Sequence, residues 1–435
     1  MTANPSTARK APGGPPKVSA RRTLISTGIG NAAEWYDWAI YATFAPYFSK
    51  QIFNPADPTS AILSALAIFA VGFVARPFGG VIFGWVGDRF GRKNAMTLTV
   101  ALAAVGSLLI GVTPTFGAVG ALASLLLVVA RLIQGLAHGG ELPSSQTYLA
   151  EMAPREKRGF WATLIYVSGT IGNMLGALLG AVLAVLLPKA DMAAWGWRLP
   201  FILGALMGLY GLVMRARMPE TEAFEEFAGQ KQSFGALMKE IVAHRKQAFQ
   251  VIGMTVGLTV IYYVWGIVAP TYAATSLKMD PGQALWAGFG ANAVFLVALP
   301  FWGKLSDRIG RKPVLLIGGV GCAVLHFPMT WLMKDSVWQL FVSMSVMLIF
   351  IAAGAAIGPA VYAELFPAKL RTAGVGIPYA LAVAAFGGTA PYLQTLFTDV
   401  VKAPWMFNAY AVVMVLISML VVVRLPETRG KDLTV

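Results

Sequence analysis

Ionisable side chains recur at helical spacing inside otherwise apolar runs of this sequence. Glu34, Asp37 and Tyr41 follow the pattern i, i+3, i+7 and therefore share one face of a helix. Both carboxylates fall near the middle of their run. A carboxylate kept from bulk water can bind and release a proton as its surroundings change, so Glu34 and Asp37 are predicted to carry protons, with Tyr41 beside them contacting substrate.

A second polar stripe lies in a later run at the same kind of spacing. It consists of Arg131, Gln134, His138, Glu141, Ser145 and Tyr148. Arginine stays charged and can bind a carboxylate through two N–H groups at once. Arg131 and Gln134 are therefore predicted to bind a substrate anion or an acid that takes part in proton transfer. A purely structural ion pair is the alternative. His138 is a candidate proton relay, although a satisfied core histidine is the simpler alternative. For Glu141, an ion pair with a nearby Arg or Lys and a functional role are both open alternatives.

Arg76 interrupts another apolar run. Its Arg-Pro-Phe-Gly context favours a structural break in the helix, and contact with substrate is the alternative.

Runs in the second half of the chain carry no Lys, Arg, Asp or Glu at mid-depth. They offer neutral polar and aromatic side chains instead: Tyr262, Tyr263, Trp265, Asn292, Tyr379, Tyr392, Gln394 and Asn408. Of these we predict substrate contacts for Tyr262, Tyr263, Asn292, Tyr379 and Gln394. Core packing or an interfacial aromatic belt is the alternative for each ring.

These residues must be positioned by membrane-spanning helices. The 435 residues are 57% hydrophobic and only 12% charged, far from the about 25% charged of soluble domains. Twelve apolar stretches of sufficient length are found at 24–48, 62–86, 95–113, 119–150, 159–186, 196–214, 249–273, 284–303, 313–333, 338–363, 372–398 and 404–424. Cys322 is the one cysteine, which excludes a disulfide framework.

The net charge of +14 arises mainly from Lys and Arg in alternate loops. This asymmetry is what the positive-inside rule predicts, so both termini are expected to be cytoplasmic, and no nucleic-acid partner is needed to explain the charge. The expected organisation is a tail, a six-helix bundle, an inner loop, a second bundle and a tail, at 1–22, 23–214, 215–248, 249–425 and 426–435.

The inner loop carries Phe234, Leu237, Met238, Ile241 and Val242 at helical spacing, which predicts an amphipathic helix on the membrane surface, with a solvated linker as the alternative.

Internal repetition relates the two bundles. The segment Gly84-Trp-Val-Gly-Asp88-Arg89-Phe-Gly91-Arg92-Lys93 returns 219 residues later as Gly303-Lys-Leu-Ser-Asp307-Arg308-Ile-Gly310-Arg311-Lys312. Echoes around Glu151 and Glu364, and around Pro219 and Pro426, have offsets of similar size. The repeats follow even-numbered helices on the same side, so the halves are predicted to be parallel repeats about an axis along the membrane normal.

The repeated decapeptide also predicts a breakable contact between the inner ends of the halves. Its carboxylates, Asp88 and Asp307, suit a neighbouring helix N-terminus, and its glycines allow close helix approach. The basic residues Arg89, Arg92, Arg308 and Arg311 are predicted to pair with Glu151 in the first half and Glu364 in the second. The alternative is positive charge that only sets topology.

At these motifs the chain resembles the major facilitator superfamily. More narrowly, it is similar to the metabolite:proton symporters in the segments Gly30-Asn31-Ala-Ala-Glu34-Trp35-Tyr36-Asp37, Arg76-Pro77-Phe-Gly79-Gly80, Arg131-Leu-Ile-Gln134-Gly135 and Trp195-Gly196-Trp197-Arg198-Leu-Pro200-Phe201. The resemblance implies twelve helices and proton-coupled import of a small carboxylate or zwitterion. Gly169, Gly172, Gly176 and Gly180 line one face of the fifth helix without a proline, which argues against a drug exporter and predicts close helix packing.

We therefore expect an all-α membrane protein with two pseudo-symmetric six-helix bundles in a bacterial inner membrane. It should import a small organic acid with protons by alternating access. Symport of a zwitterion such as proline or betaine is the alternative, and a non-transporting sensor or a channel is the alternative of another class. The sequence holds no nucleotide-binding loop and no metal-ligand motif, so no enzyme activity, cofactor or obligatory protein partner is expected.

Overall fold

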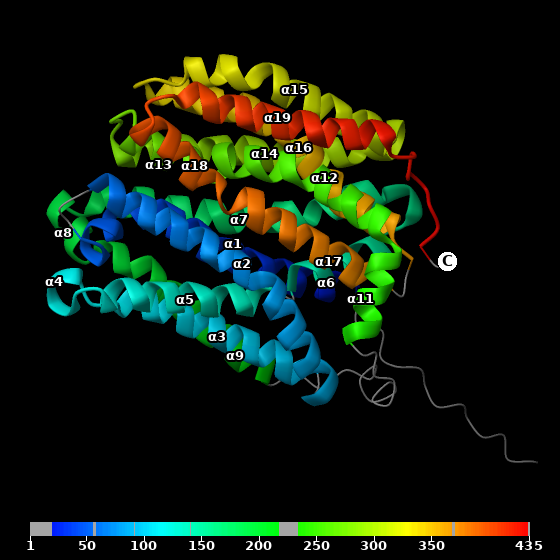
Figure 1. Ribbon diagram of the computed structural model, residues 1–435, viewed down its shortest axis with the longest axis horizontal. Coiled ribbons are helices and arrows are strands. Elements are labelled where there is room, and N and C mark those ends of the chain that lie inside the picture. The colour runs from blue at the N-terminus through cyan, green and yellow to red at the C-terminus, as the bar shows by residue number, and fades with distance from the viewer. Residues whose placement is uncertain are drawn as a thin grey trace, which may run out of the picture.

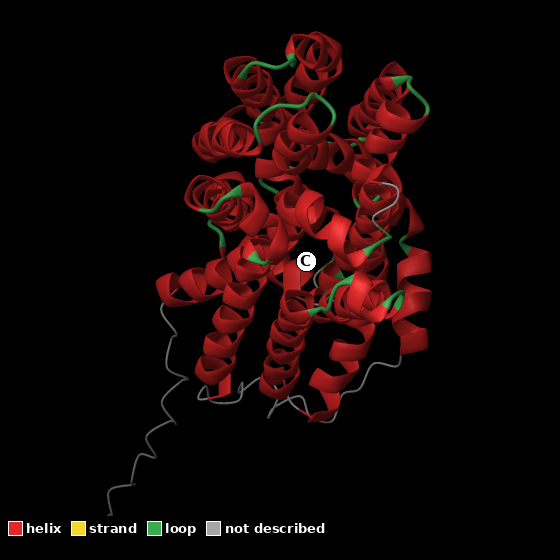
Figure 2. Cartoon of the chain, turned by 90° about the vertical axis from the view of Figure 1, so that its left-hand side faces the viewer, coloured by secondary structure: helices red, strands yellow, loops and turns green. Residues whose placement is uncertain are grey.

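The computed structural model describes residues 20–54, 58–90, 92–139, 141–216, 234–367 and 370–433. Helices account for nearly all of these residues, and no strand occurs among them (Figure 2). The long helices run roughly parallel to one another along the molecule's length (Figure 1). The expected all-α fold is confirmed.

The first half contains six long α-helices and three shorter ones. They are α1 (Ala20–Ile52), α2 (Pro58–Phe90), α3 (Arg92–Val112), α4 (Phe116–Val119), α5 (Leu122–His138), α6 (Glu141–Met152), α7 (Arg158–Leu186), α8 (Lys189–Ala194) and α9 (Leu199–Ala216). The fourth predicted helix is therefore divided, because α5 ends at His138 and α6 begins at Glu141. Helix-weakening glycine follows His138 at the division.

The second half repeats this arrangement with two interrupted helices. Its elements are α12 (Arg245–Tyr262), η3 (Tyr263–Val268), α13 (Ala269–Thr275), α14 (Pro281–Ile309), α15 (Arg311–Leu332), α16 (Val337–Leu365), α17 (Arg371–Ala382), η4 (Val383–Gly387), α18 (Ala390–Thr395), η5 (Leu396–Val400) and α19 (Pro404–Arg424). The segments η3, η4 and η5 are π-helical turns, so two of the six membrane crossings carry locally widened backbone.

Proline explains the widened turn η3. Pro270 has no N–H to donate to the carbonyl of Gly266, which an α-helix would require at that spacing. Asn292 of α14 replaces the missing donor, because its Nδ2 donates to Gly266 O at 3.1 Å. A neighbouring helix thereby satisfies a backbone group that would otherwise be orphaned inside the bundle.

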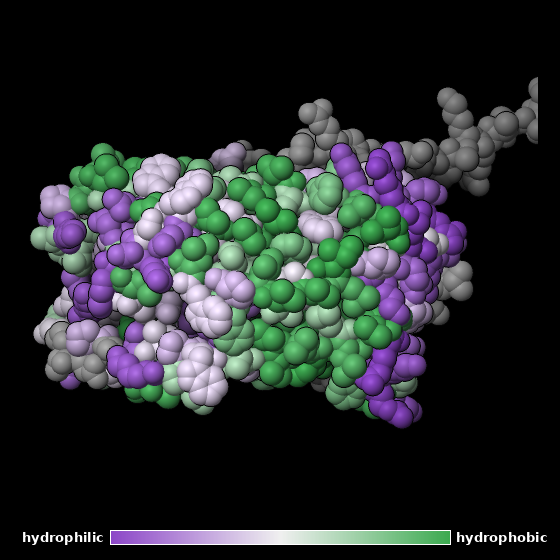
Figure 3. Space-filling view, turned by 90° about the horizontal axis from the view of Figure 1, so that it is seen from above, coloured by the Kyte–Doolittle hydropathy of each residue, from purple (hydrophilic) through white to green (hydrophobic). Residues whose placement is uncertain are grey.

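Nine helices of the described residues are long and apolar enough to cross a membrane. The remaining predicted crossings correspond to α1, with its buried acids, to α3, and to α5 with α6. Apolar side chains form a belt around the middle of the molecule, between polar ends (Figure 3). The chain is thus a multi-pass membrane protein.

Glycines permit the closest helix contacts. A Cβ on Gly172 of α7 would collide with the carbonyl of Ala32 on α1, and one on Gly139 would collide with the carbonyl of Arg76 on α2. The glycine face predicted on the fifth helix thus packs against α1. Close approach of α5 to α2 likewise brings the polar stripe of α5 next to the helix that carries Arg76.

The two decapeptides lie at the same end of the molecule, the right-hand end in Figure 1, which we call the signature end. The predicted loop helix also lies there as α11 (Phe234–Ala243). Of its expected apolar face, Ile241 is buried and Val242 is 62% exposed. The side chains of Phe234, Leu237 and Met238 lie outside the described residues.

Candidate functional site

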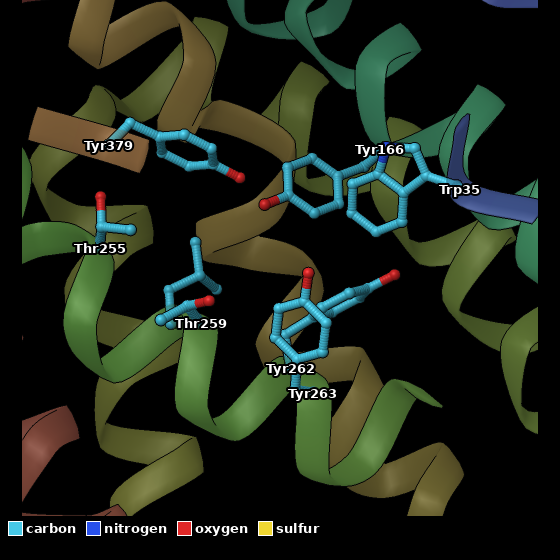
Figure 4. Close-up of a pocket in the computed structure, with 8 residues that line it drawn as sticks. Trp35, Tyr166, Thr255, Thr259, Tyr262, Tyr263 and Tyr379 are labelled. Carbon is cyan, nitrogen blue, oxygen red and sulfur yellow. The ribbon is translucent and has the colours of Figure 1, made fainter. Parts of the chain in front are cut away.

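A small cavity lies between the two halves. Its lining comes from Trp35 and Tyr166 of the first half and from six residues of the second: Thr255, Leu258, Thr259, Tyr262, Tyr263 and Tyr379 (Figure 4). The cavity volume available to the centre of a water molecule is about 10 Å³, so the cavity has room for about one water. The cavity is therefore too small to hold a metabolite in this conformation.

Aromatic and hydroxyl groups join the halves across the cavity. The hydroxyls of Tyr166 and Tyr379 point toward each other (Figure 4). Tyr262 presents its ring at 5.6 Å to Trp35 and 5.7 Å to Tyr166, and its hydroxyl accepts a 2.9 Å hydrogen bond from Asn173 Nδ2. Three predicted residues, Tyr262, Tyr263 and Tyr379, therefore line one site.

A buried ion pair flanks this cavity. Arg76 Nη2 lies 3.0 Å from Glu34 Oε1, and the two side chains are 11% and 2% exposed. The Arg76 guanidinium also packs over the rings of Trp38 and Phe73, at 4.2 and 4.6 Å from their centroids. Phe73 in turn lies 5.3 Å from Tyr263, which connects the pair to the cavity wall.

Arg131 is held differently. It is fully buried, its guanidinium packs over Trp38 at 3.9 Å and Tyr41 at 4.3 Å, and Nη1 donates to Gln134 Oε1 at 3.0 Å. No carboxylate within the described residues forms a direct ion pair with it, and its Nε and Nη2 have no hydrogen-bond partner there. Cation–π contacts and one amide thus surround this charge, away from the cavity lining.

Asp37 connects to Arg131 through a chain of hydrogen bonds. Ser107 Oγ donates to Asp37 Oδ1 at 3.0 Å and accepts from Gln134 Nε2 at 2.9 Å. Gln134 then accepts from Arg131. His138 Nε2 lies 3.7 Å from Asp37 Oδ2. The predicted proton carrier, the predicted relay and the predicted anion ligand are consequently parts of one buried network.

The other predicted contact residues lie away from the cavity. Tyr41 donates to the carbonyl of Ala65 at 2.9 Å. Asn292 supports η3, as described above, and Gln394 is buried on α18 without lining the cavity. Their predicted role in substrate contact stays a prediction.

At the signature end, the halves are joined by charged contacts. Asp307 accepts from the backbone N–H groups of Gly159 and Phe160 at 2.8 and 2.9 Å, at the start of α7. Asp307 lies inside the last turn of α14. The predicted helix instead ends at residue 303, before Asp307. Gly303 makes the approach possible, since a Cβ there would collide with Thr163 of α7.

Two arginines cross between the halves in matching ways. Arg158 donates to Glu364 Oε1 at 3.0 Å, while Arg371 donates to Glu151 Oε1. Each arginine also donates from Nε to a backbone carbonyl of its own half, at 3.1 and 3.0 Å. Arg311 Nη2 lies 3.4 Å from Glu364, as predicted. Among the described side chains, Glu151 pairs with Arg371 of the second half.

Several residues of the predicted contact cannot be placed. The side chains of Asp88, Arg89 and Arg92, the surroundings of Gly84, and the side chain of Glu141 lie outside the described residues. Arg308 is exposed, and its backbone carbonyl accepts a hydrogen bond from Arg429 Nη1.

Sequence reasoning missed Tyr166, Ser107, Arg158 and Arg371. The arginines had a detectable signal, because each stands seven residues after a repeated glutamate, Glu151 or Glu364. Ser107 had none, since a lone serine in an apolar helix usually bonds to its own backbone.

Comparisons with known proteins agree with this architecture. Residues 23–434 match the family described as "Sugar (and other) transporter". The chain is 32% identical over 402 residues to the alpha-ketoglutarate permease of Escherichia coli, covering 91% of this chain and 92% of the relative. It is 30% identical over 425 residues to a glycine betaine/proline/ectoine/pipecolic acid transporter of Dickeya dadantii, covering 95% and 84%.

Solved structures show the same fold. The xylose transporter of E. coli in a partially occluded inward-open conformation superposes with a TM-score of 0.73 at 21% identity, covering 94% of this chain and 98% of the other. The resemblance to symporters of small metabolites is thus confirmed, and the expectation that the chain is no enzyme agrees with these relatives. The chain belongs to the family described as "Sugar (and other) transporter" and has the fold of the major facilitator superfamily.

Proposed function

We propose that this transporter imports a small organic acid together with protons by alternating access. The observation that carries the proposal is the buried Glu34–Arg76 pair beside the cavity between the halves. It places an acid that can be neutralised against a cation that stays charged, next to the space where a ligand would contact both bundles.

The pair offers a direct means of coupling. Protonation of Glu34 removes the negative partner of Arg76, so the guanidinium becomes available to a substrate carboxylate. Release of the proton restores the pair and displaces the anion. Asp37 and His138 supply a second place for a proton in the same half. No cofactor takes part, since the proton gradient supplies the free energy.

Arg76 is the better candidate for the anion contact than Arg131. The sequence favoured Arg131, yet that side chain is enclosed by Trp38, Tyr41 and Phe69. Arg76 instead neighbours Tyr263, a wall of the cavity, through Phe73. The relative named alpha-ketoglutarate permease supports a carboxylate substrate.

A zwitterionic compatible solute is the second candidate. The rings of Trp35, Tyr166, Tyr262, Tyr263 and Tyr379 would suit a substituted ammonium group through cation–π contacts. Relatives named for betaine and proline support this choice. The substrate carboxylate would again meet Arg76.

The orientation follows from the charge distribution. Basic loops at the signature end assign that end and both termini to the cytoplasm of a bacterial inner membrane. Closure of the signature end by Arg158, Arg371 and Asp307 then corresponds to a carrier shut toward the cytoplasm. Lipid, protons and substrate are its partners, without nucleic acid or an obligatory protein.

The test is uptake into proteoliposomes of labelled di- and tricarboxylates, proline and betaine, under an imposed inward proton gradient. Accumulation of a carboxylate that a protonophore abolishes supports organic-acid symport, and accumulation of betaine or proline alone selects the second candidate. Flux without accumulation would indicate a channel, and absence of flux with every probe would indicate a sensor.

A further inference from the structure

A second cavity lies inside the second half, between α12, α15, α16 and α19. Its volume available to the centre of a water molecule is about 60 Å³, against about 10 Å³ for the central cavity. Glycines of α15 and α16 leave the space, and most of the remaining wall is apolar, with contributions from Met254, Ile261, Phe350, Ile351, Val415 and Met419. The proposed coupling mechanism makes no use of this cavity.

The polar groups of this wall already have partners. Ser418 Oγ donates to a backbone carbonyl of α12 at 2.6 Å and accepts from a backbone N–H of the same helix at 2.9 Å. The hydroxyl of Tyr362 accepts from Thr255 Oγ1 at 3.0 Å. Cys322 adds a thiol, which is only a weak hydrogen-bonding group. Because a water needs about two to four polar partners to stay in a cavity, this wall favours an apolar occupant.

The cavity reaches the lipid-facing surface between α15 and α19. These two helices lie side by side at the edge of the molecule (Figure 1). Gly319 and Met419 both line the cavity and are partly exposed, and a Cβ on Gly319 would lie 2.6 Å from Met419 Cγ. The adjacent Val320 and Leu420 are 49% and 51% exposed. The flexible side chain of Met419 therefore stands between the cavity and lipid.

The cavity lies in the half of the membrane next to the signature end. Leu315 stands one turn after the start of α15 at Arg311, and Val422 stands just before the end of α19 at Arg424. Arg424 is exposed, so its guanidinium can contact the phosphate of a lipid in that leaflet. Met419 is one turn and a half earlier, about 7.5 Å along the helix, which an acyl chain below that phosphate would reach.

We propose that this cavity binds part of a phospholipid acyl chain, which enters between α15 and α19 from the leaflet at the signature end. The chain fills a space whose lining would otherwise lack dispersion contacts, and such packing is what favours association within a bilayer. Leu258 lines both cavities, so the bound chain supports one wall of the central cavity from behind. The binding depends on the membrane setting of the chain and not on the proposed substrate or coupling.

Photolabelling in vesicles tests this proposal. The protein is reconstituted into phosphatidylglycerol and phosphatidylethanolamine that contain a tracer phosphatidylethanolamine with a diazirine in its acyl chain. After irradiation, mass spectrometry of the peptides compares adducts on the buried cavity residues Met254 and Ile351 with adducts on the exposed Leu420. We expect adducts on both sets, because the chain enters the cavity as well as lying on the surface.

Variants that fill the cavity sharpen the test. Cys322→Leu places more side chain in the cavity, so the ratio of buried to surface adducts should fall about tenfold or more as several methylene groups lose their site. Gly358→Ala is a second filling variant, because a Cβ there would lie in ordinary contact, 3.5 Å from the Tyr362 hydroxyl oxygen. It should lower the same ratio by a smaller factor.

Two matched controls should keep the ratio of the unsubstituted protein. Cys322→Ala removes the thiol without filling the cavity. Val324→Leu adds a leucine to the face of α15 where Val324 is 64% exposed.

The proposal is overturned when Leu420 is labelled but Met254 and Ile351 are not, or when Cys322→Leu and Cys322→Ala give equal ratios. Should Cys322→Leu fail to fold, an unchanged ratio in Gly358→Ala has the same meaning. Rapid reaction of Cys322 in the unsubstituted protein with a small water-soluble thiol reagent would show a hydrated cavity and also count against an acyl chain. Because these measurements need no transport, a negative result in the substrate panel leaves them interpretable.

Discussion

The cores of the two halves contrast in charge although the halves are repeats. Ser107 of the first half bonds to Asp37 and Gln134, beside Arg131. His326 stands 219 residues later, the same spacing as that between the decapeptides, and its Nδ1 accepts from the indole of Trp265 at 3.1 Å. At equivalent positions of the repeat, charged side chains thus lie in the core of the first bundle and neutral side chains in the core of the second.

The contrast indicates a division of labour. Charges at membrane depth are costly, and the first half keeps five ionisable side chains there in two networks, Glu34 with Arg76 and Asp37 with Arg131 and His138. The second half instead has an apolar cavity between α12, α15, α16 and α19 and supplies most of the wall of the central cavity. We infer that charge coupling is confined to one bundle while the other supplies shape.

Breaking the Glu34–Arg76 pair should have the largest effect. Glu34→Gln and Arg76→Gln each remove one member of this buried ion pair, which costs about 3–5 kcal/mol of folding free energy. Both should lower Tm and abolish accumulation driven by the gradient. The double variant should recover Tm but not accumulation, and recovery of neither would indicate that the pair does more than balance charge.

Asp37→Asn should abolish gradient-driven accumulation while exchange of substrate between internal and external pools persists. The amide keeps a group that accepts from Ser107 Oγ but does not ionise. Counterflow and gradient-driven uptake in the same proteoliposomes measure the two activities. Equal loss of both would assign Asp37 a structural role.

Arg76→Lys and Arg131→Lys compare the two buried cations. A lysine loses the forked contact with a carboxylate, so Arg76→Lys should raise the apparent substrate constant about tenfold or more. Arg131→Lys should change that constant less and lower Tm more, because the guanidinium packs over Trp38 and Tyr41. The reverse order would restore Arg131 as the anion ligand.

Neutral groups of the second half should affect stability more than coupling. Asn292→Leu leaves the carbonyl of Gly266 without its donor, at a cost of about 1–3 kcal/mol. The pH dependence of uptake should stay unchanged while Tm falls. His326→Gln serves as a comparison in the same bundle, and a shifted pH dependence in either variant would contradict the division of labour.

The smallest effect concerns the signature end. Burial acts to raise the pKa of Glu427, but backbone N–H groups of Arg311, Arg429, Lys312 and Thr428 together outweigh it and lower that pKa. The contacts of Glu427 with the start of α15 should therefore stabilise the protein fully above the usual pKa of a glutamate, and this stabilisation should be lost as pH falls through the lowered value. Tm recorded against pH tests this, with Glu427→Gln as the variant that should lack the dependence.

The sequence alone predicted the helical fold, the two repeats and the burial of the acids and arginines. Apolar length, helical spacing and duplicated motifs are local properties, and a bilayer permits few structures that satisfy the backbone. Nine of the twelve predicted crossings correspond to described helices that are long and apolar enough to span a membrane, and the prediction joined α5 and α6 into one helix.

Only the tertiary structure decided which charges meet. Glu34 pairs with Arg76 and not with Arg131, and Glu151 pairs with Arg371 between the halves. Helical spacing fixes the face of a side chain but not the rotation of its neighbour. The glycine contacts of α7 with α1 and of α5 with α2 depend on both helices of each pair at once. They set the rotation of these helices and hence which buried charges of the first half can meet.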